Sequence, residues 1–398
     1  MAIQVVQERT RGFICVTAHP EGCRRRVEEQ VATLRKSAPA PLEGPKRVLV
    51  IGSSTGYGLS TRIAATWGFG AKTVGVFLER PPENRRTASA GYYNTVAVHQ
   101  LAAADGLYAG AINGDAFSEE TKRDTVQLVK KELGKLDLVV YSIAAPRRIH
   151  PETGETMQSV LKPIGSNYTG KTIDLSNDSI TEVAMEPADE DEIVATVSVM
   201  GGEDWQMWMD LLAEENLLAE GVRTLAYSYI GPEVTWPIYR DGTIGMAKKD
   251  LVQTGHFLND SLAAEYGGGA WVSVNKAVVT QASAAIPVVP LYLSLLFRVM
   301  KQKGLHEGCI EQMSRLCLDH LAAGKQVRVD EQRLIRLDDL ELRDDVQDEV
   351  ADLWDQVNTA NLNEISDYQE FRKEFSRLFG FKVDGIDYDE PVEVDERL

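Results

Sequence analysis

The fold follows from Val48-Leu49-Val50-Ile51 and from the loop behind it, Gly52-Ser53-Ser54-Thr55-Gly56-Tyr57-Gly58. The four apolar residues predict a short buried strand, and a helix is predicted from about Leu59 to Trp67. Glycines at a turn from strand to helix let the backbone approach a pyrophosphate closely. The helix N-terminus adds unpaired N–H groups and the positive end of its dipole. This stretch therefore predicts an α/β protein that binds a nucleotide.

The chain alternates strands with helices over the next hundred residues or so. Further apolar strands are predicted at residues 72–77, 107–112 and 136–141, and Ser118 is a good N-cap for the helix before the last of them. Strands rich in valine and isoleucine that alternate with helices indicate a parallel sheet covered on both faces. The ligands of such sheets bind beyond the carboxyl ends of the strands. We therefore predict a doubly wound parallel sheet whose site lies at that edge.

The predicted organisation is one large domain over residues 1–398, with the dinucleotide-binding half at 46–146. Residues 150–220 lose the alternation and predict a hairpin and two helices, which we interpret as an insertion on the substrate side. Residues 221–330 resume the sheet and are the predicted catalytic half. Residues 331–398 are acidic and predict a helical C-terminal appendage.

The charge of the chain excludes one class of function. Lysine and arginine number 42 and aspartate and glutamate 60, a net charge of −18, whereas a nucleic-acid binder needs a basic face. The N-terminus lacks the apolar core of a signal peptide. The most apolar stretch, Ala284 to Met300, contains Pro287 and Pro290 and is short for a bilayer span. We expect a cytoplasmic protein with no nucleic-acid partner and no stable membrane association.

The four cysteines, Cys15, Cys23, Cys309 and Cys317, contain no CxxC pair and favour a reducing compartment. Zinc sites use tighter pairs than Cys15 and Cys23, which have His19 between them. We therefore expect buried thiols and no metal.

Two acidic residues follow predicted strands. Glu79 stands where a carboxylate accepts both ribose hydroxyls of an adenosine, and its charge would repel a 2′-phosphate and favour NAD over NADP. A solvated glutamate next to Arg80 is the alternative. Asp115 suits an adenine edge, although an aspartate before Ser118 also fits a helix cap.

A second cluster, Tyr239-Arg-Asp-Gly-Thr-Ile-Gly-Met-Ala-Lys248, combines a tyrosine with a lysine. In carbonyl reduction such a lysine binds the nicotinamide ribose and favours the ionised phenol, while the phenol bonds the substrate oxygen. Nine residues of continuous helix would place the two side chains on opposite faces. We therefore predict that Tyr239 lies on a turn, that Thr243 is the N-cap and that Lys248 lies on the second helical turn. A buried structural tyrosine is the alternative.

Several motifs occur together in this chain. Beside the loop at Gly52 and the Tyr-x8-Lys pair, these are Ala18-His-Pro-Glu-Gly-Cys23, Tyr227-Ser-Tyr229-Ile-Gly-Pro, Ser273-Val-Asn-Lys-Ala-Val-Val-Thr280 and His306-Glu-Gly-Cys-Ile-Glu-Gln312. In this combination the chain resembles the FabV-type enoyl reductases and the trans-2-enoyl-CoA reductases, from Arg11 to the region of Tyr388. Ordinary short-chain dehydrogenases place three residues between the tyrosine and the lysine, and the commoner enoyl reductases place six. The resemblance implies a Rossmann core with a small substrate-binding extension, in a monomer.

The resemblance also implies a role for each site residue. The pyrophosphate would lie on Gly52, Ser53, Ser54, Thr55, Gly56 and Tyr57, the adenosine ribose on Leu78 and Glu79, and adenine beside Asp115 and Ala116. The nicotinamide would lie beside Ile143 and Ala144, with Val278, Val279 and Thr280 as a further cofactor-binding stretch. Tyr239 would be the proton donor, Lys248 the cofactor-binding lysine and Tyr229 a substrate contact.

The implied reaction is the NADH-dependent reduction of the 2,3-double bond of trans-2-enoyl thioesters in fatty-acid synthesis. Negative charge develops on the thioester oxygen when hydride adds to the β-carbon, and the Tyr239 hydroxyl is placed to stabilise it. The carrier, coenzyme A or acyl carrier protein, stays open, and Arg147 and Arg148 are candidates for phosphate contacts. Residues 288–300 either wall the acyl chain or pack in the core. A ketoreductase or epimerase on the same fold and a non-catalytic dinucleotide sensor are the alternatives.

Overall fold

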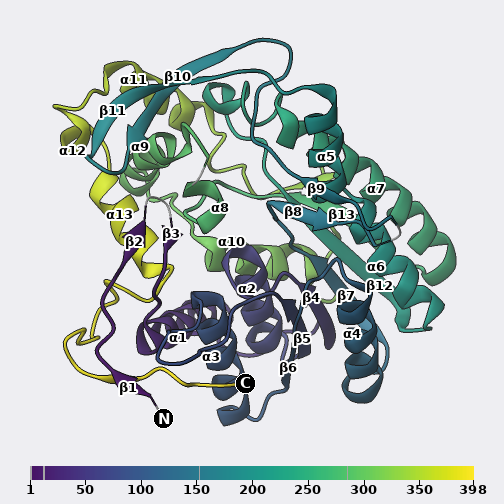
Figure 1. The fold of residues 1–398 in the computed structure, drawn as a ribbon. Helices are drawn as coiled ribbons and strands as arrows, with labels where there is room; N and C mark the ends of the chain where they lie inside the picture. The colour runs from purple at the N-terminus through teal and green to yellow at the C-terminus, as the bar shows by residue number, and fades with distance from the viewer. Residues whose placement is uncertain (1, 12–13, 152, 285) are drawn as a thin grey trace.

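A parallel sheet forms the centre of the protein (Figure 1). The structure, a computed structural model, describes residues 2–11, 14–151, 153–284 and 286–398. Within them seven strands lie in the spatial order β6, β5, β4, β7, β12, β13 and β14. Their bounds are β4 Arg47–Ile51, β5 Lys72–Phe77, β6 Ala109–Asn113, β7 Leu136–Tyr141, β12 Leu218–Ser228, β13 Gly269–Val274 and β14 Leu334–Arg336. The chain runs outward from β4 to β6, returns to β7 and continues the other way, so the predicted doubly wound sheet is confirmed.

Helices cover both faces of this sheet (Figure 1). One layer consists of α1 (Pro20–Ser37), α2 (Gly56–Ile63), α3 (Ala90–Ala104) and α10 (Cys309–Leu316). It packs on Val48 and Val50 of β4. The other layer consists of α4 (Glu119–Glu132), α6 (Glu203–Glu214) and α7 (Thr243–Tyr266), and it packs on Leu49 and Ile51. Successive side chains of a strand point to opposite faces, so a central strand covered on both sides is apolar throughout.

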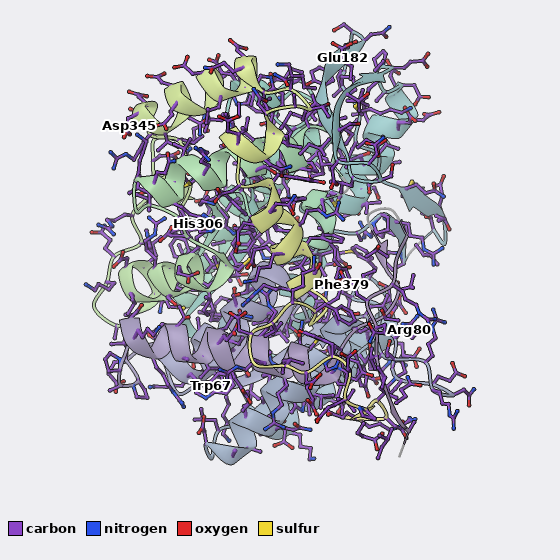
Figure 2. All side chains as sticks on the ribbon, turned by 90° about the vertical axis from the view of Figure 1, so that its left-hand side faces the viewer. Trp67, Arg80, Glu182, His306, Asp345 and Phe379 are labelled. Atoms are coloured by element: carbon purple, nitrogen blue, oxygen red, sulfur yellow. The ribbon has the colours of Figure 1, made fainter. Side chains whose placement is uncertain are left out.

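The segment between β7 and β12 contains the predicted hairpin. Its strands, β10 (Tyr168–Asp174) and β11 (Ser179–Met185), pair antiparallel, and a smaller ribbon of β8 (Arg147–Ile149) and β9 (Thr156–Gln158) precedes them. Asp189 then caps α5 (Glu190–Met200) in a capping box with Glu192. Figure 2 shows Glu182, on the hairpin, at the opposite end of the molecule from Trp67, which follows α2. The hairpin thus lies at the end of the molecule away from Trp67.

The most apolar stretch forms a core helix. Its main part is α9 (Val289–Gln302), in which residues 291–296 are fully buried, while residue 285 lies outside the described residues. The C-terminal helices α11 (Asp344–Gln356) and α13 (Tyr368–Arg377) pack against α9. Figure 2 shows Asp345 of α11 at the same end of the molecule as Glu182. Most of the stretch is therefore core, and only its first residues reach the cavity described below.

The remaining elements are short. They are β1 Ile3–Gln4, β2 Thr10–Arg11, β3 Ile14–Cys15, β15 Val392–Glu393, α8 Gln281–Ala284, α12 Leu362–Ile365, the 3₁₀ turn η2 Glu233–Thr235 and the π turns η1 Ala64–Gly68 and η3 Cys317–Leu321. Three of the four free cysteines are buried, and Cys309 is partly exposed. Across the described part of the chain, no helix combines the length and apolarity needed to cross a membrane. No group of three histidine, cysteine or acidic side chains in the same residues is placed to hold a metal ion.

Candidate active site

A cavity of about 510 Å³ lies at the carboxyl ends of the central strands. Its lining includes most of the predicted site residues: Gly52, Ser54, Thr55, Gly56, Tyr57, Leu78, Glu79, Asp115, Ala116, Ile143, Ala144, Tyr229, Tyr239, Lys248, Val278 and Thr280. Ser53 and Val279 are not part of it. The Ser53 hydroxyl donates to the Val76 carbonyl (3.2 Å), and Val279 lines a smaller neighbouring cavity. Segments far apart in the sequence thus meet at the predicted edge of the sheet.

The loop between β4 and α2 is shaped to receive a pyrophosphate. Gly52 has a φ of +86°, and a Cβ there would lie 2.0 Å from the carbonyl oxygen of Ser142, so only glycine fits. Thr55 precedes α2 without capping it through its side chain, which leaves the first N–H groups of the helix open. Thr55, Gly56 and Tyr57 line the cavity. The residues present therefore fit a dinucleotide.

The Glu79 carboxylate is held in place by its neighbours. Its Oε1 accepts a hydrogen bond from the Ser54 hydroxyl (2.8 Å), and the Asn113 side chain bonds both the N–H and the carbonyl of Glu79 (2.9 and 2.8 Å). Gly91 of α3 packs so closely that a Cβ there would lie 1.9 Å from Oε1. Burial raises the pKa of Glu79, and hydrogen bonds from Ser89 and Ser54 oppose that shift. The alternative of a freely solvated glutamate is therefore wrong.

Asp115 shapes the loop before α4 but does not cap the helix. Its Oδ1 accepts a hydrogen bond from the Phe117 N–H (3.0 Å) and so shapes the turn before α4. The cap itself is Ser118, as predicted, because its hydroxyl oxygen accepts from the Thr121 N–H (3.2 Å). Asp115 and Ala116 both line the cavity. The aspartate therefore supports the loop and also faces the space predicted for adenine.

Tyr239 lies in a turn before α7, as the spacing predicts. Its N–H donates to the Thr235 carbonyl (3.0 Å), and the helix starts behind Gly242, which places Lys248 on the second turn. The predicted N-cap is wrong by one residue, because Gly242 caps α7 and Thr243 is its first residue. The Thr243 hydroxyl instead donates to the Val160 carbonyl (2.5 Å). It therefore ties α7 to the segment between β7 and β12.

Tyr229 and Tyr239, two of the tyrosines that line the cavity, differ in what their hydroxyls bond. Tyr229 donates to Oε1 of Glu341 (3.0 Å). In the part of the chain that the structure describes, the Tyr239 hydroxyl makes no hydrogen bond, and its ring meets that of Tyr229 edge-on with the centroids 4.9 Å apart. Of the two, only Tyr239 therefore has its hydroxyl hydrogen available for a ligand.

Burial governs the protonation of both Tyr239 and Lys248. It raises the pKa of the Tyr239 phenol, so the hydroxyl stays protonated, and it lowers the pKa of Lys248 to about 8. The Lys248 ammonium donates one hydrogen bond to the Tyr227 carbonyl (3.1 Å) and has two further hydrogens to offer a ligand. Burial of the Tyr239 phenol thus favours its neutral form, opposite in direction to the effect expected of the lysine.

Two buried charged residues at the site are not among the predicted ones. Lys276 is 1% exposed and lines the cavity, its ammonium donates to the Ala277 carbonyl (2.7 Å), and burial lowers its pKa to about 8. Glu341 is fully buried behind Tyr229. Lys276 lies within the Ser273–Thr280 motif, so the sequence could have identified it as a site residue. Nothing among the many acidic residues near the C-terminus distinguishes Glu341.

Arg148 does not serve the role predicted for it. Its side chain is buried over the Phe117 ring, and its guanidinium donates to the Ser198 carbonyl (2.8 Å) and to Glu203 (2.5 Å). A phosphate outside the cavity cannot reach it. Arg147 is exposed, so the prediction of a carrier contact stands for that residue alone.

Reduction with a nicotinamide dinucleotide needs a pyrophosphate cradle, a carboxylate for the adenosine ribose and a proton-donating group near the nicotinamide. The cavity at the strand ends offers all of these on a doubly wound sheet. Fold and site together define the class of dinucleotide-dependent oxidoreductases.

Models of protein families show which dinucleotide-dependent oxidoreductases this chain belongs with. They match residues 5–84 (NAD(P)H binding domain of trans-2-enoyl-CoA reductase), 86–322 (trans-2-enoyl-CoA reductase catalytic region) and 329–392 (enoyl reductase FAD binding domain). The chain belongs to the trans-2-enoyl-CoA reductase family.

Similar proteins carry two kinds of name. The chain is 53% identical to the NADH enoyl-acyl-carrier-protein reductase of Coxiella burnetii, over 99% of this chain and 97% of that one. It is 55% identical to the trans-2-enoyl-CoA reductase of Euglena gracilis, over 99% of this chain and 72% of that one. The crystal structure of Treponema denticola trans-2-enoyl-CoA reductase in complex with NAD has a TM-score of 0.94 and 46% identity, and the match covers 99% of both chains.

The residues matched by the FAD-binding model do not fit a flavin dinucleotide. The glycines of residues 329–392 are Gly380 and Gly385, and both follow α13 rather than joining a strand to a helix. The first turn of α11 carries Asp344 and Asp345, whose charges would repel a pyrophosphate. The apolar residues of α11 and α13 are buried in the same core cluster as α9. This segment therefore covers α9 and supplies Glu341 to the site.

Proposed function

We propose that this chain reduces the 2,3-double bond of trans-2-enoyl thioesters with NADH, and that Tyr239 donates a hydrogen bond to the thioester oxygen. The observation that carries this proposal is the Tyr239 hydroxyl, which bonds no other described residue and shares one cavity with Lys248 and the glycine-rich loop. The names of the Coxiella and Euglena relatives support it, since both specify an enoyl thioester and the first specifies NADH.

The cofactor would lie along the strand ends. Its pyrophosphate would lie on residues 52–57, its adenosine ribose at Glu79, and its adenine beside Asp115. The nicotinamide would lie between residues 143–144 and residues 278–280. When bound, NADH supplies the hydride that adds to the β-carbon of the substrate.

Side chains of the protein then stabilise the negative charge of the reaction and orient the cofactor. As the β-carbon gains hydride, negative charge develops on the thioester oxygen, and a neutral phenol at Tyr239 stabilises it by donating its hydrogen. A phenolate has no hydrogen to donate, so the raised pKa of Tyr239 suits this role. Lys248, anchored on the Tyr227 carbonyl, directs its other hydrogens to the nicotinamide ribose. The α-carbon then takes a proton from the Tyr239 hydroxyl, which is replaced from solvent, and this completes the saturated acyl thioester.

The proposed setting is fatty-acid synthesis in the cytoplasm, by a monomer. Free cysteines suit a reducing compartment. Relatives of nearly equal identity are named for coenzyme A and for acyl carrier protein, so we propose that the enzyme accepts both carriers. In this view the acyl chain and thioester enter the cavity while the carrier stays outside. The division into a dinucleotide-binding half, a substrate-side insertion, a catalytic half and an appendage remains a prediction.

The function is tested by the oxidation of NADH, followed by absorbance. We expect turnover with crotonyl-CoA and with crotonyl-acyl-carrier protein, and none with the matching 3-ketoacyl thioester. Turnover of the ketoacyl substrate alone would instead favour the ketoreductase alternative. Tight NADH binding without turnover of any thioester would favour a dinucleotide sensor.

Replacing Glu79 with glutamine is expected to change the choice of cofactor. The variant loses a charged hydrogen-bond acceptor worth about 1.5–3 kcal/mol, so the KM for NADH should rise by roughly tenfold or more. The KM for NADPH should fall, because the repulsion of its 2′-phosphate is removed. Steady-state kinetics with both cofactors measure this. The exposed Glu83→Gln is the matched control and should leave both constants unchanged. Unchanged NADPH kinetics in the Glu79 variant would place the ribose elsewhere.

A further inference from the structure

Glu341 is a fully buried carboxylate behind the wall of the candidate active site. It lies in the turn between β14 and α11. Its Oε1 accepts hydrogen bonds from the hydroxyls of Tyr229 (3.0 Å) and Tyr292 (2.6 Å), and its Oε2 accepts one from the Ala277 N–H (2.6 Å). These donors lie directly after β12, in α9 and in the loop after β13. One side chain of the C-terminal segment thus joins three elements around the cavity.

The surroundings of Glu341 keep it in this position. Gln347 donates to its main-chain carbonyl (2.6 Å) and to the Tyr292 hydroxyl (3.2 Å), which fixes the turn. Burial raises the pKa of Glu341, while the nearby positive charge of Lys276 and the three hydrogen bonds favour its ionised form. The Ala277 N–H can only donate, and the hydroxyls of Tyr229 and Tyr292 both lie within hydrogen-bond distance of Oε1.

This has a chemical consequence for Tyr229. A phenol has one hydroxyl hydrogen, and in Tyr229 that hydrogen points at Glu341. Tyr229 therefore cannot donate to a substrate oxygen at the same time, although its ring packs edge-on against Tyr239. The two phenols that face the cavity from residues 229 and 239 are thus no longer equivalent.

We propose that Glu341 is a positioning residue for the reduction: by accepting the hydroxyl hydrogen of Tyr229, it fixes the ring against which the donor Tyr239 packs. This inference rests on the proposed function of Tyr239. A purely structural requirement does not explain the arrangement, because apolar residues of similar volume fill a buried site without the cost of desolvating a charge.

The test is Glu341→Gln, which keeps the shape of the side chain. Its amide can still accept from the Ala277 N–H only by turning its NH₂ group toward the tyrosines, so Tyr229 loses its acceptor. We expect kcat to fall by about tenfold, since small misplacements near a reacting centre cost up to ~10²-fold. The KM for NADH should change by less than about twofold, because the Ala277 bond is kept. Tyr229→Phe should lower kcat by a similar factor, and the double variant should lose no more than either single one.

Asp338→Asn is the matched control. Asp338 is also fully buried and lies in the same turn, but its carboxylate pairs with Arg336 (2.8 and 2.7 Å) outside the cavity. This variant should lower the melting temperature and leave kcat unchanged. Should Glu341→Gln fail to fold, the comparison of Tyr229→Phe with Tyr292→Phe decides: the first should lower kcat and the second should not.

Two results would overturn the inference. One is a wild-type kcat in Glu341→Gln or, where that variant does not fold, in Tyr229→Phe. The other is a double variant whose loss is the product of the single losses. Neither result touches the role of Tyr239, which is overturned only by full activity of Tyr239→Phe.

Discussion

Replacing Tyr239 with phenylalanine is expected to lower kcat for crotonyl-CoA by about 10²–10³-fold, the effect of removing one donor to a developing oxyanion. The ring and its contact with Tyr229 are kept, and the variant loses only a hydroxyl that bonds no other described residue. NADH binding, followed by fluorescence, should therefore be unchanged. Steady-state absorbance at saturating NADH measures the loss.

Tyr93→Phe is the control for this experiment. Tyr93 is also a buried phenol, but its hydroxyl bonds the Ala88 N–H (3.0 Å) and the Val394 carbonyl (2.8 Å) away from the cavity. We expect that variant to lose stability and keep its kcat. If Tyr239→Phe keeps the wild-type kcat, the thioester oxygen is stabilised by another group, and the proposed mechanism fails.

Replacing Gly52 with alanine is expected to abolish NADH binding and to lower the free energy of unfolding by about 2–5 kcal/mol, from overpacking plus a left-handed backbone. The added Cβ would lie 2.0 Å from the Ser142 carbonyl oxygen. Neither side can move easily, because the Gly52 N–H donates to the Val76 carbonyl (2.9 Å) and the Ser142 N–H to the Ile51 carbonyl (2.8 Å). Urea unfolding and NADH titration measure the two effects.

The control Gly106→Ala separates the effect of the left-handed backbone from the effect of the contact with Ser142. Gly106 has a similar φ of +71°, but a Cβ there would meet nothing within 4 Å. This control should cost only the backbone strain, about 1–2 kcal/mol, and leave NADH binding intact. Equal losses of unfolding free energy and of NADH binding in the two variants would show that the contact with Ser142 does not contribute.

The sheet could be predicted from the sequence because each strand carries its own local signal. Strands buried on both faces are apolar throughout, and the predicted bounds of β5 and β7 agree with those in the structure. The glycine-rich loop at Gly52 correctly indicated the edge of the sheet at which the cavity lies. The 11-residue β12 begins at Leu218, before residue 221, where the sheet is predicted to resume, and a register shift interrupts its pairing with β7. Such an irregularity leaves no periodic pattern to recognise.

The candidate site was less predictable where it depends on partners distant in sequence. Gly52, Glu79 and Tyr239 stand in motifs, so their positions followed from the sequence. That Tyr229 bonds Glu341, 112 residues away, did not. The same holds for Arg148, whose burial depends on Glu203 and Ser198. Local pattern shows which residues are candidates, and tertiary contacts decide which of them are free to react.

The turn before α7 determines how Tyr239 and Lys248 are placed relative to each other. Tyr239 and Lys248 are separated by a chain reversal, and a Cβ at Gly245 would lie 1.8 Å from the Arg240 carbonyl, so the turn folds tightly onto the start of the helix. A residue inserted into the turn would lengthen the loop without rotating Lys248, whereas one inserted in the helix before Lys248 would swing it by about 100°. An insertion in the turn should therefore change the direction of Lys248 less than an insertion in the helix. The chemistry constrains the positions of the two side chains and not the number of residues between them.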